Sequence, residues 1–261
     1  MGRTIFITSF KGGVGKTTLT ANLATAFTEL GKNVLVIDAD YGNRCMDLVL
    51  GLESSSLFDG ADVINGDIGA ESAIVRHDTN KKLSFLAAPA SFAEELNVPE
   101  TEKLLAQLKE KYDFVLVDSS AENNAVYRAF ARSADDALVV TFHQSTAIRA
   151  AEKTASVLSA LGFADIRMVL NCYYRDADRA GALPSVYDII QRAHIKLAGV
   201  VPYDLYVAPL QENGSLPYGH RGSLMPFEAA TMNIAKRLLG ISVPLFKDVY
   251  KPKKLEKYLR F

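Results

Sequence analysis

Short apolar runs, largely free of charged residues, recur along the chain with amphipathic segments between them. Runs of this kind, rich in β-branched residues, are typical of strands that are buried on both faces of a parallel sheet. The strands expected from this pattern lie at residues 4–9, 33–38, 83–87, 113–118, 137–141, 166–171 and 196–201.

The segments between these strands repeat apolar residues at helical spacing, as in residues 100–111, where Leu104, Leu105 and Leu108 share one side. Gly31 follows the first of these segments in a position that commonly ends a helix. The other helices are expected at residues 17–30, 57–64, 124–132, 147–161, 185–193 and 227–239, and residues 39–52 are expected to be mainly loop.

Alternation of strands and helices implies right-handed crossovers between parallel strands. The chain is therefore expected to form an α/β fold with a mostly parallel central sheet and helices on both faces. No internal repeat or linker interrupts the pattern, so we expect one domain over residues 1–246 and a tail over residues 247–261.

The junction between the first strand and the first helix carries a glycine-rich turn, residues 9–18 (SFKGGVGKTT). A strand, a glycine turn and a helix start in this order form a phosphate-binding loop, in which backbone N–H groups and the helix dipole face an anion. Lys16 can reach the terminal phosphates, and the Thr17 hydroxyl is placed to bind Mg²⁺. The residues predicted to hold the nucleotide here are Gly12, Gly13, Val14, Gly15, Lys16, Thr17 and Thr18. The loop thus predicts a P-loop NTPase.

Three carboxylates follow predicted strands at the edge of the sheet where ligands gather. Asp118 ends an aliphatic run, which is the form of a Walker B motif, and Asp38 ends the second strand. We expect both to lie at the Mg²⁺ site, with Asp118 acting through a water. Asp40, beside Gly42 on the following loop, is the candidate for orienting the attacking water. The alternatives are a turn residue for Asp118 and a solvated loop carboxylate for Asp40.

Composition narrows the class of protein. Hydrophobic residues make up 49% and charged residues 23% of the 261 residues, and the net charge of −1 gives no overall attraction to nucleic acid. Cys45 and Cys172 have no CxxC spacing, which argues against a structural zinc site or a disulfide scaffold and fits a reducing cytosol. No signal-peptide pattern or spanning segment is present, so we expect a cytoplasmic protein whose membrane contacts are made from the surface.

Lys11 stands directly before the glycines, where an ordinary phosphate loop requires no lysine. With this lysine, the sequence KGGVGKTT resembles the deviant Walker A motif of the MinD/ParA family of ATPases. Residues 37–48 (IDADYGNRCMDL) resemble the switch region of the MinD branch more than the D-x-D-x-Q form of the ParA branch. Residues 117–121 and 196–202 resemble further motifs of that branch, and the likeness runs through nearly the whole chain. Phe10 stands at the first glycine of the general pattern, a position often replaced in this family, and has no predicted role.

The resemblance implies further roles. Lys11 would cross a dimer interface to the partner's ATP, so the chain would form a homodimer with ATP that opens after hydrolysis. Lys11, Lys16 and Asp40 would then be the catalytic residues. Asn171, at the end of a strand, would bond the adenine, since an amide offers both a donor and an acceptor. Without the resemblance, Asn171 is a strand-end turn residue.

Several residues depart from the family pattern. Ser120 stands where the family usually has proline, and Glu122 where the MinD branch has glycine. Cys172 and Tyr173 follow Asn171 in place of the commoner arginine-type context. Pro209 is expected to break the helix start near the adenine.

Residues 251–261 (KPKKLEKYLRF) can be drawn as a short helix after Pro252. Leu255, Tyr258 and Leu259 would share one face, opposite lysines and an arginine. Such a helix is a candidate for binding an anionic membrane surface and resembles in kind the C-terminal targeting helix of the MinD branch. One copy is too small to hold a monomer, so two in a dimer would be needed. The alternative is a frayed terminus packed back on the domain.

The sequence therefore predicts an ATP- and Mg²⁺-dependent ATPase of the MinD type, reversibly peripheral on the inner face of the cell membrane. It would position cell-division or other machinery, and a protein activator would stimulate slow hydrolysis. One alternative is a ParA-like ATPase that binds DNA non-specifically. Another is a non-hydrolysing scaffold switched by ATP. A reductase related to nitrogenase iron protein needs bridging cysteines, for which Cys45 and Cys172 are poor candidates.

Overall fold

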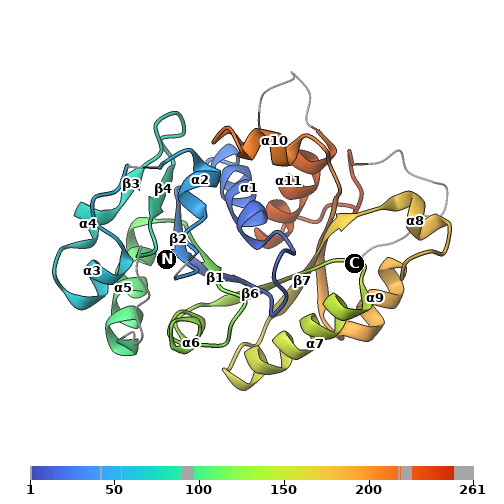
Figure 1. The fold of residues 1–261 in the computed structure, drawn as a ribbon, viewed down its shortest axis with the longest axis horizontal. Coiled ribbons are helices and arrows are strands. Elements are labelled where there is room, and N and C mark those ends of the chain that lie inside the picture. The colour runs from blue at the N-terminus through green and yellow to red at the C-terminus, as the bar shows by residue number, and fades with distance from the viewer. Residues whose placement is uncertain are drawn as a thin grey trace.

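A single twisted sheet runs through the molecule and carries helices on both faces (Figure 1). The computed structural model describes residues 2–41, 43–53, 55–89, 97–216, 218 and 225–249. The strands are β1 (Arg3–Thr8), β2 (Val34–Ala39), β3 (Val75–Arg76), β4 (Leu83–Leu86), β5 (Phe114–Ser119), β6 (Asp136–Thr141), β7 (Ile166–Tyr173) and β8 (Lys196–Pro202). Their order in the sheet is β3-β4-β2-β5-β1-β6-β7-β8. The pairings among β4, β2, β5, β1, β6, β7 and β8 are parallel, and β3 joins antiparallel to β4. The predicted α/β P-loop architecture is confirmed.

Helices cover both faces of the sheet. They are α1 (Lys16–Glu29), α2 (Met46–Leu50), α3 (Gly60–Asn65), α4 (Ala70–Ala73), α5 (Val98–Lys111), α6 (Ala125–Arg132), α7 (Ser145–Ala160), α8 (Arg175–Arg179), α9 (Val186–Ala193), α10 (Val207–Gln211) and α11 (Pro226–Leu238). In Figure 1, α1, α10 and α11 lie above the sheet, and α6, α7 and α9 below it. Alternate residues of each strand serve the two layers: Ile5 and Ile7 pack in one core, and Phe6 in the other. This alternation is why the strands read as continuous apolar runs.

One prediction about the helices was incomplete and one was wrong. Residues 39–52 are mainly loop, as expected, but they also contain the short helix α2, and the buried Asp38 carboxylate accepts the Met46 N–H at its start. This cap comes from the neighbouring strand, so no local pattern announces it. Pro209 does not break a helix, because it is the third residue of α10. The first N–H groups of a helix have no partner within it, so a proline is tolerated there.

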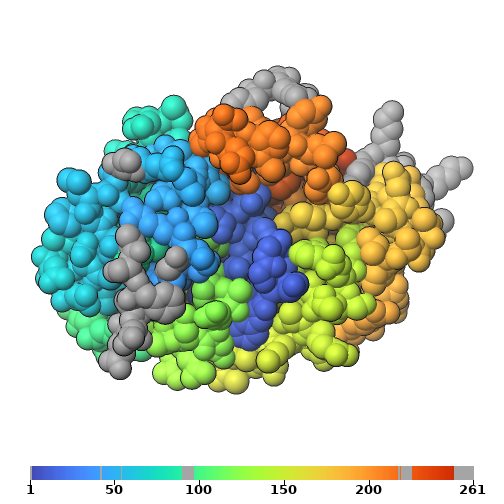
Figure 2. All heavy atoms as spheres, in the orientation of Figure 1, coloured from blue at the N-terminus to red at the C-terminus, as the bar shows by residue number. Residues whose placement is uncertain are grey.

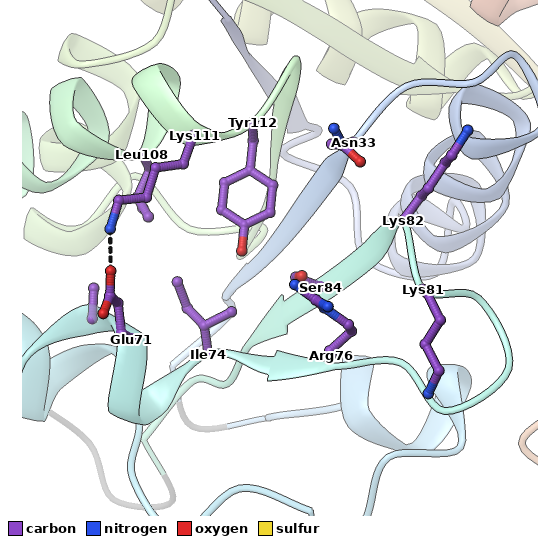
Figure 3. Close-up of a pocket in the computed structure, with 11 residues that line it drawn as sticks. Asn33, Glu71, Ile74, Arg76, Lys81, Lys82, Ser84, Leu108, Lys111 and Tyr112 are labelled. Atoms are coloured by element: carbon purple, nitrogen blue, oxygen red, sulfur yellow. Dashed lines mark hydrogen bonds and ion pairs between the residues drawn. The ribbon is translucent and has the colours of Figure 1, made fainter.

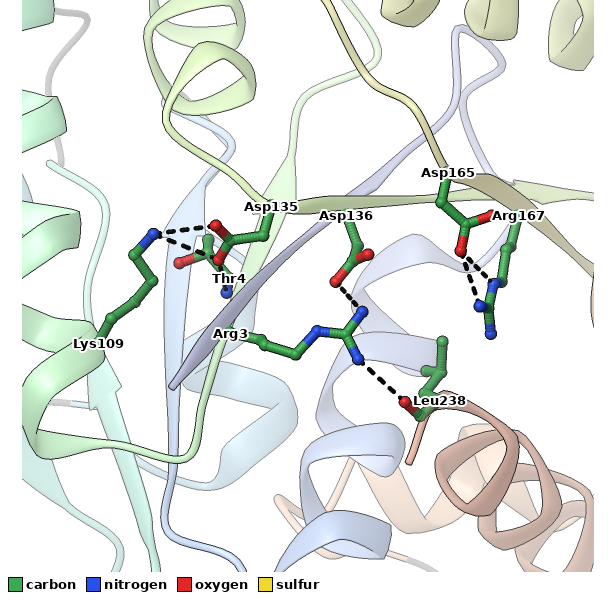
Figure 4. A network of polar contacts seen from close by, with 8 residues as sticks. All are labelled: Arg3, Thr4, Lys109, Asp135, Asp136, Asp165, Arg167 and Leu238. Atoms are coloured by element: carbon green, nitrogen blue, oxygen red, sulfur yellow. Dashed lines mark hydrogen bonds and ion pairs between the residues drawn. The ribbon is translucent and has the colours of Figure 1, made fainter. Parts of the chain in front are cut away.

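Ion pairs and charged hydrogen bonds occupy the amino-terminal ends of the central strands (Figure 4). Arg3, which starts β1, contacts the Asp136 carboxylate at 2.5 Å and the Leu238 carbonyl at 3.2 Å. Asp135, which precedes Asp136, accepts the Thr4 N–H at 2.7 Å and pairs with Lys109 at 3.0 Å. These contacts fasten β1 to β6 and to the ends of α5 and α11. In open α/β sheets, ligands bind at the opposite, carboxyl ends of the strands, so a ligand site is expected in the loops there.

The segment after α11 packs back on the domain. Leu245 and Val249 are buried, and the Asn233 amide donates to the Lys247 carbonyl at 2.6 Å. Lys247 and Val249 fall on the tail side of the predicted boundary yet contact the domain. The proposed amphipathic helix at residues 251–261 lies outside the described residues, so it stays a prediction. Across the described part of the chain, no helix has the length and apolarity needed to span a membrane.

Candidate nucleotide-binding site

The loop between β1 and α1 has the backbone that a phosphate cradle needs. Gly13 and Gly15 have φ angles of 75° and 84°, in the left-handed region that favours glycine. A Cβ on Gly15 would also lie 2.5 Å from the amide nitrogen of Asn171. The helix α1 starts at Lys16, directly after the turn. Its first N–H groups are therefore directed at the loop.

A cavity of about 650 Å³ opens beside this loop. In Figure 2 the start of the chain, in dark blue, lies at the centre of one face between the light blue segment after β2 and the green segment after β5. The residues that line the cavity are Gly12, Gly13, Gly15, Lys16, Thr17, Thr18, Asp40, Tyr41, Asn43, Ser120, Ala121, Glu122 and Asn124. The lining thus brings Asp40 together with most of the predicted loop residues, whereas Val14, Lys11 and Asn171 are not part of it.

Asp118 and Thr17 are in direct contact at the floor of the site. The Thr17 hydroxyl donates to the Asp118 carboxylate at 2.6 Å, and the Thr20 hydroxyl lies 3.3 Å from its other oxygen. Burial raises the pKa of Asp118 to about 6, although the Thr17 hydrogen bond and the charge of Lys16 oppose that rise. The carboxylate is 1% exposed, so its charge depends on these few neighbours.

Asp38 lies beside Asp118 in the sheet, because the two residues are paired in the register of β2 and β5. Asp38 accepts the Asp40 N–H at 2.9 Å and the Met46 N–H at 3.2 Å. Burial, and then repulsion from Asp118, raises its pKa to about 8. Two neighbouring buried carboxylates repel each other, and a cation would relieve that repulsion.

The donors present fit Mg²⁺, which binds one or two carboxylates and keeps waters and phosphate oxygens for its other positions. Among the described residues, no three His, Cys, Asp or Glu side chains gather closely enough to hold a metal alone. A Mg²⁺ ion here would therefore rest on the Thr17 hydroxyl, the Asp118 and Asp38 carboxylates, and the nucleotide. Cys45 and Cys172 are both free thiols.

Asp40 sits at the wall of the cavity and is half-buried. Its carboxylate accepts the Asn43 side-chain amide at 3.1 and 3.2 Å. Asn43 is thus a further residue of the site that sequence reasoning did not identify. The only indication in the sequence was that Asn43 lies three residues after Asp40. Gly42 lies outside the described residues.

The buried Asn171 side chain is hydrogen-bonded to the backbone of the phosphate loop. Its side-chain amide donates to the Val14 carbonyl at 2.8 Å, and the residue is 4% exposed. The next residue, Cys172, has a φ of 50°, and the register between β7 and β8 is interrupted between Leu170 and Tyr173. Such an irregularity re-aims side chains at a strand end. The adenine contact of Asn171 stays a prediction, and the structure adds a loop-bracing role that the sequence did not suggest.

Two more contacts complete the site, one between distant parts of the chain and one within a turn. The Thr18 hydroxyl donates to the Gln211 side chain in α10 at 3.1 Å, across 193 residues of sequence. Where the family has proline, the Ser120 hydroxyl donates to the Glu122 carbonyl at 3.1 Å and so closes the turn. No sequence spacing could have paired Thr18 with Gln211.

Lys11 and Phe10 have opposite environments. Lys11 is exposed at the surface of the loop. The Phe10 ring is partly buried and lies 5.5 Å from the ring of Tyr127, and its N–H donates to the Thr154 hydroxyl at 3.1 Å. The residue that had no predicted role therefore joins the loop to α6 and α7.

A second cleft, of about 440 Å³, lies near the amino-terminal ends of β2 and β4 (Figure 3). It contains Arg76, Lys81, Lys82 and Lys111. Lys111 pairs with Glu71 at 2.5 Å, and Lys82 donates to a backbone carbonyl at 3.3 Å. The cleft holds none of the predicted site residues, and its cations point in different directions, so it is no rival to the cavity beside the loop.

Comparison with known proteins agrees with this geometry. Residues 5–218 match the CobQ/CobB/MinD/ParA nucleotide binding domain. The chain is similar to the septum site-determining protein MinD of Synechocystis, with 34% identity over 94% of this chain and 92% of that protein. For MinD of Bacillus subtilis the identity is 36%, over 94% and 92% of the two chains.

Solved structures give the same result. MinD in the MinC:MinD cell division protein complex of Aquifex aeolicus superimposes with a TM-score of 0.86 at 32% identity, over 94% of this chain and 98% of that one. The septum site-determining protein MinD of Pyrococcus horikoshii, complexed with Mg-ADP, gives a TM-score of 0.80 at 27% identity, over 91% and 96%.

Proposed function

The chain belongs to the CobQ/CobB/MinD/ParA family of nucleotide-binding domains, and we propose that it is a MinD-type ATPase acting in cell division. The observation that carries the proposal is the direct bond between the Thr17 hydroxyl and the buried Asp118 carboxylate beneath a glycine loop. This arrangement places the residues proposed to hold Mg²⁺ directly beside the loop proposed to bind the phosphates. The Pyrococcus relative with Mg-ADP supports the same ligands here.

Each residue has a proposed part in ATP hydrolysis. The backbone of residues 12–15 and the Lys16 ammonium bind the phosphates, and Thr18 completes the cradle. Thr17, Asp118 and Asp38 would hold Mg²⁺, which would supply neutralisation of the phosphate charge. Asp40, braced by Asn43, orients the attacking water. Asn171 accepts from the adenine amine through its carbonyl oxygen while its amide nitrogen holds Val14.

The proposal extends to a cycle of assembly. ATP joins two copies of the chain, with Lys11 of each reaching the nucleotide of the other. The dimer presents two basic tails to an anionic membrane, and hydrolysis releases it to the cytoplasm. A protein partner stimulates turnover, and the MinC:MinD complex of a relative supports a partner on this kind of domain.

Sedimentation with anionic liposomes tests this proposal. We expect the chain to co-sediment in Mg-ATP, and to remain in the supernatant with ADP or without nucleotide. A truncation after Val249 is the matched control, because it removes the tail but keeps the contacts of Lys247 and Val249 with the domain. It should bind ATP normally and lose the liposomes.

Three results would contradict the proposal. Equal sedimentation of the truncated and full-length chains would remove the tail's role. Salt-sensitive DNA binding in ATP, with no liposome binding, would favour the ParA-like alternative. Absence of ATP turnover even with candidate partners would leave only an ATP-switched scaffold.

A further inference from the structure

Phe10 separates the buried Ser9 from the exposed Lys11 in the phosphate loop. We propose that Phe10 is a positioning residue, which fixes the first half of the loop to α6 and α7 and so aims Lys11 at the partner chain. This inference rests on the proposed role of Lys11 in the dimer. The activity proposed above assigns nothing to Phe10, Tyr127 or Thr154.

The ring of Phe10 rests on a rigid platform. Tyr127 is 1% exposed, and its ring meets Phe10 at 5.5 Å and Phe6 of β1 at 4.9 Å in an edge-to-face pair. The Thr8 hydroxyl lies 3.2 Å from the Tyr127 hydroxyl. The Phe10 ring therefore packs on the same tyrosine that contacts β1, the strand directly before the loop.

The backbone of Phe10 has a second, independent anchor. Its N–H donates to the hydroxyl of Thr154 at 3.1 Å, and that hydroxyl donates to the Ala150 carbonyl of α7 at 2.7 Å. Thr154 is fully buried, so its hydroxyl cannot turn to water. The ring and the backbone of one residue are thus held by two different helices.

The remainder of the loop shows why this anchoring matters for Lys11. The second half is held separately, by Asn171 at Val14 and by α1 from Lys16 onward. Between the halves lie Gly12 and Gly13, where a Cβ would meet nothing within 4 Å. Lys11 adjoins this open glycine pair. The anchored Phe10 and the bond from the Lys11 N–H to the buried Ser9 hydroxyl at 3.3 Å keep the lysine backbone from sharing the freedom of the glycines. A backbone fixed in advance loses less entropy when a partner binds.

The same platform joins Lys11 to the wall of the cavity. Tyr127 lies in α6, and the Asn124 side chain caps that helix by accepting the Tyr127 N–H at 2.9 Å. Asn124 lines the cavity with Ser120 and Glu122. Phe10, which precedes Lys11, therefore packs on the same helix, α6, that is capped from the segment after Asp118.

The test compares self-association with nucleotide binding. Phe10→Gly, Phe10→Tyr and Thr154→Val are made in a chain that also carries Asp40→Ala to slow turnover, with Lys11→Ala as the reference. Sedimentation velocity in Mg-ATP gives the protein concentration at half-dimerisation. Fluorescent ADP measures nucleotide affinity in the monomer, and thermal melting shows that each variant is folded.

We expect Phe10→Gly to raise the half-dimerisation concentration by about tenfold, the ratio expected when the backbone of one residue must be ordered on association. ADP affinity should stay within about threefold, because the residues around Lys16 are anchored separately. Thr154→Val should shift association in the same direction, and Phe10→Tyr should behave as the parent chain. If Phe10→Gly does not fold, Thr154→Val and Phe10→Tyr still decide the question.

Two outcomes overturn the inference alone: normal association of Phe10→Gly and Thr154→Val while Lys11→Ala fails to dimerise, or an equal loss of ADP affinity and association. Normal association of Lys11→Ala overturns the proposed dimer, and the inference with it. The failures of the two proposals are thus distinguishable.

Discussion

Because its carboxylate is buried, Asp118 is expected to lower the stability of the protein without nucleotide. Its pKa is raised from 3.8 to about 6, chiefly by burial. The native protein therefore binds a proton at Asp118 more tightly than the unfolded chain does. The contribution of Asp118 to stability consequently falls as the pH rises from 3.8 to about 6, and above that range the loss due to Asp118 is complete.

Asp118→Asn should remove this cost, because the neutral amide resembles the protonated acid. Each pKa unit corresponds to about 1.4 kcal/mol, so the variant should be more stable than the wild type by about 3 kcal/mol at pH 7.5 and by about half of that at pH 5. Both polar partners of the carboxylate are hydroxyls, from Thr17 and Thr20, and the Thr17 hydroxyl can turn to accept from the amide. For a chain of this size the gain at pH 7.5 corresponds to roughly 6–12 °C in melting temperature.

Thermal unfolding followed by circular dichroism, at both pH values and with or without Mg-ATP, measures the effect. With nucleotide at about 100 times its Kd the wild type should gain about 2.7 kcal/mol, whereas Asp118→Asn should gain little because it lacks a Mg²⁺ ligand. Asp136→Asn is the control: it breaks a pair with Arg3, whose side chain is 44% exposed. It should therefore lose at most about 1 kcal/mol. The reasoning is refuted if Asp118→Asn melts below the wild type at pH 7.5 without nucleotide, or if its gain is equal at both pH values.

Three further substitutions test other parts of the structure. Gly15→Ala should abolish nucleotide binding in a fluorescent-ADP titration, because the added methyl would meet the Asn171 amide at 2.5 Å and the backbone there has a positive φ; binding within about threefold of the wild type would contradict this. Asp40→Asn should keep ATP affinity and lose phosphate release by about a hundredfold or more, and equal turnover would remove its proposed role. Phe27→Ala should lower the free energy of unfolding by about 3–5 kcal/mol in urea, since Phe27 is fully buried and stacked on Phe114 with ring centres 4.0 Å apart; a loss below about 1 kcal/mol would show that the core repacks.

The sheet and the residues at its carboxyl edge were predictable because both follow from local pattern. Apolar runs fixed where β2 and β5 end, and a parallel sheet brings those ends to one edge. Asp38 and Asp118 were therefore expected close together, and the register pairs them. The two-residue strand β3 was missed, since a segment that short with one arginine shows no strand pattern.

The contacts that complete the site could not be predicted, because they join residues far apart in the sequence. Asn171 reaches Val14 across 157 residues, and Thr18 reaches Gln211 across 193. Sequence pattern places each of these residues at an element end, but only the packing of elements decides which atoms meet. The same holds for α2, whose first N–H group is satisfied by a carboxylate from β2.

The two sides of the phosphate loop are stabilised by different physics, and this division suits a nucleotide switch. Asp38 and Asp118 lie on the α1 side. Their buried carboxylates destabilise the protein without ligand, and a bound cation would relieve that cost. On the α6 and α7 side the contacts are neutral: the Phe10 ring on Tyr127 and the Thr154 hydrogen bond. Neutral contacts do not depend on the charge of the ligand, so the half of the loop that carries Lys11 should keep its geometry as the nucleotide changes. The response to ATP and its loss should therefore be concentrated in the segments that follow β2 and β5.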